Sequence, residues 1–181
     1  MDSLTFPLRA TFLALPLEQE AKWQFQALQE EIKSFEGILR FQNPQTPHLT
    51  LQYWHEVMEI EYSSIVTQAE KIAATAQPFK LKCTGVSTFG SRSEDRVLFL
   101  DIAFSEELAR LKKACPWPSA KAFSPHITLA RIGHSQRFAV QKKKILKVLD
   151  NCEFEIPIDR LRLYSEIDGR RQTPIAEYPF Q

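Results

Sequence analysis

The sequence predicts an α+β fold of two duplicated lobes, in which mainly antiparallel sheets carry outer helices and enclose a central cleft. Three observations support this prediction. The pattern Pro-His-x-Thr-Leu occurs twice, as PHLTL at residues 47–51 and as PHITL at residues 125–129. Strand-like and helix-like segments follow one another in the same order in both halves of the chain. The length of 181 residues allows a hydrophobic core without disulfides or metals.

The first half of the chain is predicted to fold as strand, helix, strand, helix, strand. The strands are compact or alternating apolar runs, and the helices carry apolar residues at steps of three and four. The second helix stops before Pro78, because the residue before a proline disfavours the helical region. The predicted elements are a strand at residues 8–16, a helix from Ala21 to Phe35, a strand at 48–54, a helix from Ile65 to Ala76 and a strand at 79–90.

The second half repeats this order and adds an edge strand. Pro174 and Pro179 fit poorly inside a sheet, so the segment at residues 172–180 is expected at an edge. The predicted elements are a strand at 96–104, a helix from about Ser105, a strand at 126–132, a helix carrying Ile145, Val148 and Leu149, and a strand at 152–166. We predict a single domain over residues 1–181, made of pseudo-repeat lobes at roughly 8–92 and 94–181.

Composition and charge exclude several classes of protein. The formal net charge of +1 argues against a protein that holds long duplexes by neutralising many phosphates. Three widely spaced cysteines without a C-x-x-C pair argue against a disulfide framework and a zinc cage. The apolar run ATFLALPL does not read as a signal peptide, and no other segment approaches membrane-spanning length. We therefore expect a cytoplasmic protein without a membrane contact.

The repeated motif predicts an active site with two histidines. Successive side chains on a strand point to opposite faces, so His48 and Thr50 share one face. His126 and Thr128 do the same on the second strand. If the two halves are related by a pseudo-twofold axis, the two polar faces meet across the cleft.

This set of side chains suits hydrolysis of a cyclic phosphodiester. One imidazole can deprotonate water while the other protonates the departing sugar oxygen, since an ordinary histidine pKa of about 6.5 makes both forms accessible near neutral pH. The threonine hydroxyls can donate hydrogen bonds to the non-bridging oxygens. These roles need neither a metal nor a cofactor, and they leave open which histidine is the acid.

The sequence resembles the two-histidine (2H) phosphoesterase superfamily, and within it the RNA 2',3'-cyclic phosphodiesterase branch, long called 2'-5' RNA ligase or LigT-like. The segments TFLALP, PHLTL, SPHITLAR and LRLYSE carry the resemblance and occur in the family's order over nearly the whole chain. The resemblance implies the duplicated 2H phosphoesterase fold. It also implies hydrolysis of 2',3'-cyclic phosphates on RNA 3' ends or nucleotides to 2'-phosphomonoesters.

The resemblance implies roles for the four motif residues. His48 and His126 would be catalytic, with His48 as the acid and His126 as the base. Thr50 and Thr128 would bind the substrate phosphate. Alternatives remain: a nucleotide or RNA-end binding module without turnover, 2'-5' RNA ligase activity, or two core histidines satisfied by strand hydrogen bonds. Because the cleft is complete within one chain, we expect a monomer.

Two further residues are candidates for contact with substrate. Arg131 lies five positions after His126, so strict alternation places it on the opposite face unless the strand bulges. It could form a surface ion pair or contact the phosphate, and the resemblance favours phosphate contact. Trp54 shares the face of His48 by parity and could stack on a nucleobase, or it could equally cap the core.

Overall fold

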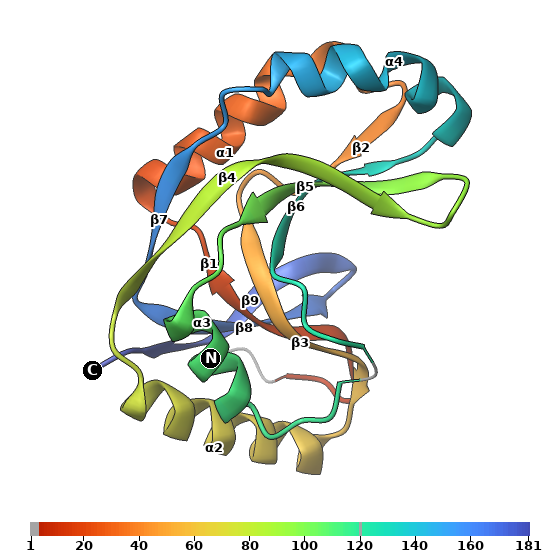
Figure 1. Cartoon of the computed structure of the whole chain (residues 1–181). Helices are drawn as coiled ribbons and strands as arrows, with labels where there is room; N and C mark the ends of the chain where they lie inside the picture. The colour runs from red at the N-terminus through yellow and green to blue at the C-terminus, as the bar shows by residue number, and fades with distance from the viewer. Residues whose placement is uncertain (1–3, 120) are drawn as a thin grey trace.

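The computed structural model describes residues 4–119 and 121–181 and contains two antiparallel sheets with helices outside them (Figure 1). The elements are β1 (Leu8–Pro16), α1 (Gln19–Glu31), a 3-10 helix (Lys33–Phe35), β2 (Leu39–Phe41), β3 (His48–Val57), α2 (Glu59–Thr75), β4 (Phe79–Gly90), β5 (Asp95–Ile102), α3 (Glu106–Ala114), β6 (His126–Ile132), α4 (Ser135–Val148), β7 (Phe154–Ile158), β8 (Arg160–Ile167) and β9 (Arg170–Pro179). The predicted α+β fold is confirmed.

The two sheets are covered by different helices. The four-stranded sheet has the order β3-β1-β8-β9, and α2 packs against its β8 and β9. The five-stranded sheet has the order β2-β6-β5-β4-β7, and α1 and α4 pack against it at β7 and β5. Figure 1 shows α1 and α4 at one end of the molecule and α2 and α3 at the other. The predicted outer helices are therefore present.

Each sheet takes strands from both halves of the chain. β4 from the first half lies in the five-stranded sheet, and β8 and β9 from the second half complete the four-stranded sheet. The boundary between the predicted lobes 8–92 and 94–181 lies in the turn between β4 and β5, which pair with each other in one sheet. The sheets therefore do not coincide with the stretches 8–92 and 94–181, and the reading of these stretches as repeat units stays a prediction.

The prediction of one strand over residues 152–166 is wrong. This segment forms β7 in the five-stranded sheet and β8 in the four-stranded sheet, with Asp159 between them. The buried residues reveal the change, because Ile156 and Ile158 are two apart whereas Leu161 follows after three. The three-residue strand β2 was not predicted, since so short a segment shows no periodicity.

Most other boundaries agree with the predictions. β1, β4 and β6 have the predicted limits, and β9 is an edge strand. The Ser105 hydroxyl accepts a hydrogen bond from the Leu108 amide at 3.1 Å, which caps α3 at the predicted start. α4 ends at Val148, which is 42% exposed, whereas Leu149 just beyond it is buried.

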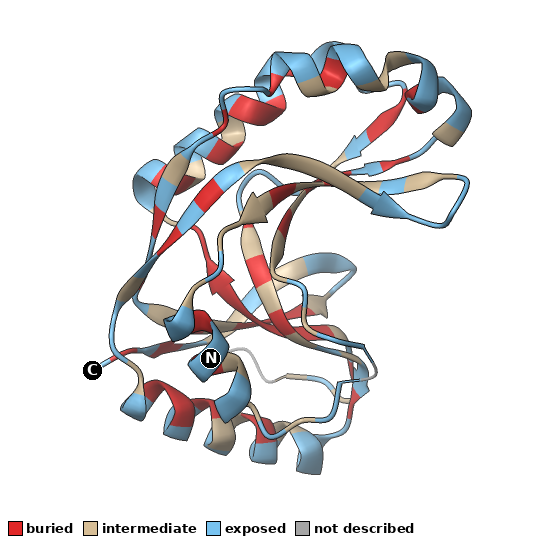
Figure 2. Cartoon of the chain, viewed as in Figure 1, coloured by how far each residue is buried: buried red, intermediate tan, exposed pale blue. Residues whose placement is uncertain are grey.

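The core lies between each sheet and its helices, as the buried positions in Figure 2 show. A smaller buried cluster of Phe12, Ala14 and Tyr164 is separate from this core. Cys83 and Cys152 are free, buried thiols with their Sγ atoms 3.6 Å apart. No helix among residues 4–119 and 121–181 is both long enough and apolar enough to cross a membrane.

Candidate active site

The two motif strands contact each other although they belong to different sheets. β3 is an edge strand of the four-stranded sheet, and β6 is next to the short edge strand β2 in the five-stranded sheet. His48 and His126 begin these two strands. The two imidazoles are close enough for the charge of His126 to contribute to the pKa of His48. The structure thus brings the predicted pair together.

Both imidazoles are held by the same kind of hydrogen bond. Nδ1 of His48 lies 2.7 Å from the carbonyl oxygen of Thr46, and Nδ1 of His126 lies 2.7 Å from that of Ser124. A carbonyl oxygen can only accept a hydrogen bond, so Nδ1 is the donor in each ring. In the neutral state Nε2 therefore keeps a lone pair, and it is the atom through which each ring can exchange a proton.

His48 lies half-buried among aromatic rings. Phe12 stacks on it with ring centroids 4.6 Å apart, and the centroid of Tyr164 is 5.5 Å away. Burial lowers the pKa of His48 to about 4; the Thr46 carbonyl opposes this change, and the charge of His126 adds to it. His48 is therefore neutral near pH 7 in the unliganded chain.

His126 is enclosed by aromatic edges rather than by a stacked ring. The ring centroids of Phe89 and Phe99 are 5.1 and 5.6 Å from that of His126, in edge-to-face arrangements. Asp101 is the cross-strand partner of His126 on β5. These contacts hold the ring beside two aromatic side chains.

The two threonines lie where the sequence predicts them. Thr50 is the cross-strand partner of Ala14, and Thr128 is the partner of Phe99, each on the same face as its motif histidine. Both side chains are half-buried. Among residues 4–119 and 121–181, neither hydroxyl makes a hydrogen bond, so both can donate to a bound phosphate.

A bulge brings Arg131 to the face of His126. Thr128 pairs with Phe99, but Ala130 pairs with Leu98, so Leu129 is an additional residue in β6. Arg131 then pairs with Val97, which is two residues from Phe99 and shares its face. Strict alternation would have placed Arg131 on the core side. Contact between Arg131 and a phosphate therefore depends on the bulge.

A second bulge removes Trp54 from the face of His48, which favours the core-capping alternative over base stacking. Thr50 pairs with Ala14 but Gln52 pairs with Leu13, so the face changes at Leu51. Trp54 instead packs against the core, with its ring edge-on to Trp117 at 5.1 Å.

Tyr53 takes the place that the sequence assigned to Trp54. Tyr53 is the cross-strand partner of Phe12, whose ring stacks on His48, and its side chain is 52% exposed. The alternation of residues 48–54 in the sequence does not reveal that Tyr53, and not Trp54, shares the face of His48. Only the pairing with β1 places Tyr53 on the face that carries His48 and Thr50.

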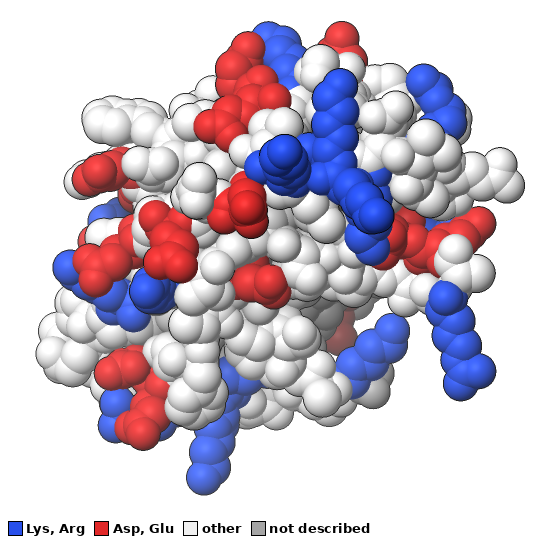
Figure 3. All heavy atoms as spheres, turned by 45° about the horizontal axis from the view of Figure 1, so that its top comes forward, with Lys and Arg blue, Asp and Glu red and all other residues white. Residues whose placement is uncertain are grey.

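The charge pattern suits a small anionic group better than a long polyanion. Figure 3 shows acidic side chains flanking the basic ones over the visible face. No group of three or more His, Cys, Asp or Glu side chains that could hold a metal ion occurs within residues 4–119 and 121–181.

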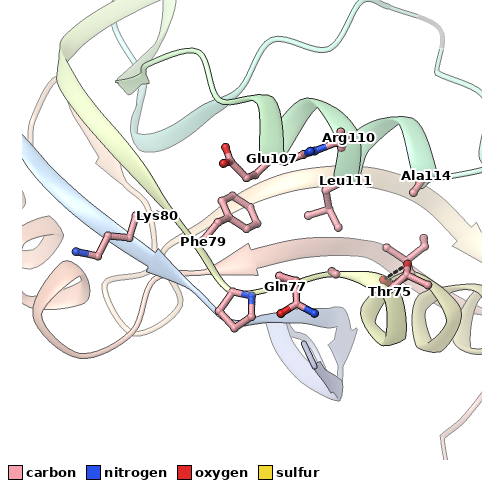
Figure 4. Close-up of a pocket in the computed structure, with 11 residues that line it drawn as sticks. Thr75, Gln77, Phe79, Lys80, Glu107, Arg110, Leu111 and Ala114 are labelled. Carbon is pink, nitrogen blue, oxygen red and sulfur yellow. Dashed lines mark hydrogen bonds between the residues drawn. The ribbon is translucent and has the colours of Figure 1, made fainter.

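A separate hollow of about 660 Å³ lies between the end of α2, the start of β4 and α3 (Figure 4). Phe79 and Leu111 supply apolar surface, and Glu107 and Arg110 lie above them. None of the four motif residues lines it. The hollow is therefore separate from the paired histidines.

The comparisons with known proteins agree with this geometry. The family model described as the 2'-5' RNA ligase superfamily matches residues 16–170. The RNA 2',3'-cyclic phosphodiesterase of Aquifex aeolicus is 27% identical over an alignment of 133 residues, which covers 67% of this chain and 70% of that protein. The protein of the same name from Archaeoglobus fulgidus is 25% identical over an alignment of 128 residues, which covers 67% of this chain and 71% of that protein.

Solved structures show the same fold. The apo form of Escherichia coli LigT superposes with a TM-score of 0.71 at 22% identity, covering 96% of this chain and 98% of that chain. TT0787 of Thermus thermophilus also has a TM-score of 0.71, at 20% identity, covering 94% and 97%. The predicted LigT-like fold is confirmed.

Proposed function

The chain belongs to the 2'-5' RNA ligase superfamily, and we propose that it hydrolyses 2',3'-cyclic phosphates at RNA 3' ends or on nucleotides to 2'-phosphomonoesters. The observation that carries the proposal is the matched pair of imidazoles, each with Nδ1 bonded to a backbone carbonyl and Nε2 left for proton exchange. The names of the curated relatives support the same reaction.

The proposed reaction is an in-line displacement at phosphorus. Nε2 of His126 accepts a proton from water, and the resulting oxygen forms a bond to phosphorus. The bond from phosphorus to the sugar 3'-oxygen breaks, and Nε2–H of His48 gives that oxygen its proton. The product has a 2'-phosphate and a free 3'-hydroxyl. His126 gains one proton and His48 loses one, so the total charge of the two histidines is unchanged.

The remaining motif residues stabilise the phosphate. The Thr50 and Thr128 hydroxyls donate to the non-bridging oxygens as negative charge accumulates on them. Arg131 adds a cation on the same face as His126. All these groups come from one chain, which supports a monomer as the active unit, and none of the proposed roles requires a metal or a cofactor.

The acid role of His48 couples its protonation to binding. Burial keeps this imidazole neutral in the unliganded chain. An anionic phosphate against the ring favours the imidazolium and raises its pKa. Substrate binding would therefore generate the acid that cleavage requires, because the pKa of His48 is lower when no phosphate is bound.

The test is hydrolysis of a short RNA that ends in a 2',3'-cyclic phosphate, with a chelator present. Wild type is compared with His48→Ala, His126→Ala and the control His134→Ala, which removes a histidine at the start of α4. We expect each motif variant to lose at least about 100-fold in kcat, and the control to keep the wild-type rate.

Each possible result has a distinct meaning. Wild-type activity in either motif variant would disprove the two-histidine mechanism, and loss of activity with chelator would indicate a metal-dependent reaction. Tight binding without product would indicate an RNA-end binding module. Joined RNA at high concentrations of RNA ends would show that the chain also catalyses 2'-5' ligation.

A further inference from the structure

The bulge in each motif strand is bonded by a side chain that comes from a helix. In β6, the Leu129 carbonyl accepts a hydrogen bond of 3.1 Å from Nε2 of Gln29 on α1. In β3, the Leu51 carbonyl accepts a hydrogen bond of 2.6 Å from Nζ of Lys112 on α3. These two leucines are the additional residues that interrupt the ladders directly after the motif threonines. Both bulges therefore have the same kind of support from outside their sheets.

Gln29 is a buried polar residue that uses both amide protons at this junction. Its side chain is 8% exposed, and Nε2 also donates to the Gln42 carbonyl at 2.8 Å. Both acceptors are carbonyl oxygens, so the nitrogen of the Gln29 amide must face them. The backbone amide of Gln42 donates to the same Leu129 oxygen at 3.1 Å. Gln29 thus joins α1, the residue after β2 and the bulge of β6, and its loss would cost a buried carbonyl its donor.

Lys112 is held against β3 by several contacts. Besides the bond to Leu51, its Nζ lies 3.4 Å from the side-chain oxygen of Gln52 and 5.3 Å from the centroid of the Phe123 ring. Its side chain is half-buried, whereas that of the adjacent Lys113 is exposed. A bond to a charged donor is stronger than one between neutral groups, so Lys112 ties the second bulge firmly to α3.

The two contacts cross between the halves of the chain. α1 lies in the first half and supports the motif strand of the second half, whereas α3 lies in the second half and supports the motif strand of the first. The two helices are at opposite ends of the molecule (Figure 1). Gln29 and Lys112 are each two residues before the last residue of their helix. This matched placement argues against two unrelated packing contacts.

We propose that Gln29 and Lys112 are positioning residues of the active site, which hold the two bulges in place. This inference rests on the proposed function. Without its bulge, regular alternation would turn Arg131 in β6 towards the core, and it would turn Tyr53 in β3 away from the face of His48. Gln29 therefore acts on the reacting phosphate through Arg131. Lys112 acts on a bound base through Tyr53.

The experiment for Gln29 couples it to Arg131, with a dinucleotide that ends in a 2',3'-cyclic phosphate as substrate. We expect Gln29→Met to lower kcat/KM about tenfold, as the loss of a buried hydrogen bond would give. In a chain that already carries Arg131→Gln, the same substitution should lower kcat/KM less than about twofold. The matched control Gln24→Met, at an exposed position of α1, should keep the wild-type kcat/KM.

The experiment for Lys112 uses the same substrate and couples this residue to Tyr53. We expect Lys112→Met to raise KM about fivefold with little change in kcat, because stacking on a base contributes to binding. Once Tyr53→Ala is present, Lys112→Met should change KM less than about twofold. The matched control Lys113→Met should keep the wild-type KM.

A purely structural role would give a different pattern. It would produce the same loss whether or not the partner is already substituted, and that result for either donor would overturn its positioning role. The crossed pairs, Gln29 with Tyr53 and Lys112 with Arg131, should show independent effects. Thermal unfolding identifies a variant that does not fold, and the other donor then decides the inference.

Failure of the proposed function gives a separate result. If wild type hydrolyses no cyclic phosphate, the proposed function fails. Calorimetric affinities for a dinucleotide that ends in a 2'-phosphate then replace the rates, and the same comparisons decide whether Gln29 and Lys112 position Arg131 and Tyr53. Wild type that does not bind this dinucleotide either would overturn the inference as well.

Discussion

Acidification is expected to destabilise the chain through His48. The pKa of this histidine is about 4 in the folded chain, compared with an ordinary value of 6.5 when it is exposed by unfolding. The unfolded chain therefore binds the proton more tightly, and stability falls as the pH decreases from above 6.5 towards 4. The difference corresponds to about 2 kcal/mol at pH 5 and about 3 kcal/mol below pH 4.

Urea unfolding at pH 7.5 and pH 5 measures this contribution. Every carboxylate of the chain also affects the pH dependence, so the informative quantity is the difference between wild type and His48→Gln. The free energy of unfolding should fall by about 2 kcal/mol less in this variant, whose amide does not titrate. The control Val140→Ala, at an exposed residue that does not titrate, should lose as much as wild type.

Equal losses in wild type and His48→Gln would refute the inference that His48 is held neutral by burial. Inorganic phosphate provides a second measurement on the same group. If the site binds phosphate against His48, the pKa of this imidazole, followed by NMR, should rise on addition of phosphate. An unchanged pKa at saturating phosphate would contradict the coupling between substrate binding and the acid role.

Three further predictions concern the chemistry and the cleft face. For each variant we compare the rate on a 2'-deoxynucleoside 3'-(p-nitrophenyl phosphate) with the rate on a cyclic phosphate. This ratio should be at least about tenfold higher in His48→Ala than in His126→Ala, because nitrophenolate leaves without a proton and needs no acid. Equal ratios in the two variants would contradict the assignment of His48 as the acid. Thr128→Val should lower kcat about 100-fold while urea unfolding changes by less than about 1 kcal/mol, whereas a loss of stability alone would make this threonine structural. Tyr53→Ala should raise KM for RNA ends about tenfold, because Tyr53 stacks on a base. Trp54→Ala should instead lower the free energy of unfolding in urea by about 2 kcal/mol. The reverse pattern would mean that Trp54, and not Tyr53, stacks on the base.

The elements that depend on local periodicity could be predicted from the sequence. The strand at residues 8–16 and the start of the helix after Ser105 agree with the structure because apolar spacing and a capping hydroxyl are local signals. The exchange of strands between the sheets could not be predicted in this way. β7 and β8 both alternate, and alternation does not identify the sheet to which a strand belongs.

Interrupted alternation along the two motif strands explains why Trp54 and Arg131 lie on other faces than regular alternation predicts. A period of two assigns faces correctly only until an additional residue interrupts the ladder, and each motif strand has one such residue immediately after its threonine, Leu51 in β3 and Leu129 in β6. Both leucines are three positions after the motif histidine and are buried. The face assignment therefore holds for histidine and threonine and reverses beyond them, which takes Trp54 off the face of His48 and brings Arg131 onto the face of His126.

The position of these bulges has a functional consequence. If both strands alternated regularly, Gln52 and Trp54 would follow Thr50 on one side of the cleft, and Ala130 would follow Thr128 on the other. The bulges instead present Tyr53 on the four-stranded sheet and Arg131 on the five-stranded sheet. An aromatic ring can stack on a base and a cation can bind a phosphate, and both contacts occur in proteins that bind single-stranded nucleic acid. The same irregularity in both strands thus supports an active site for nucleotides, and its recurrence three residues after each histidine supports the interpretation of the two halves as repeat units.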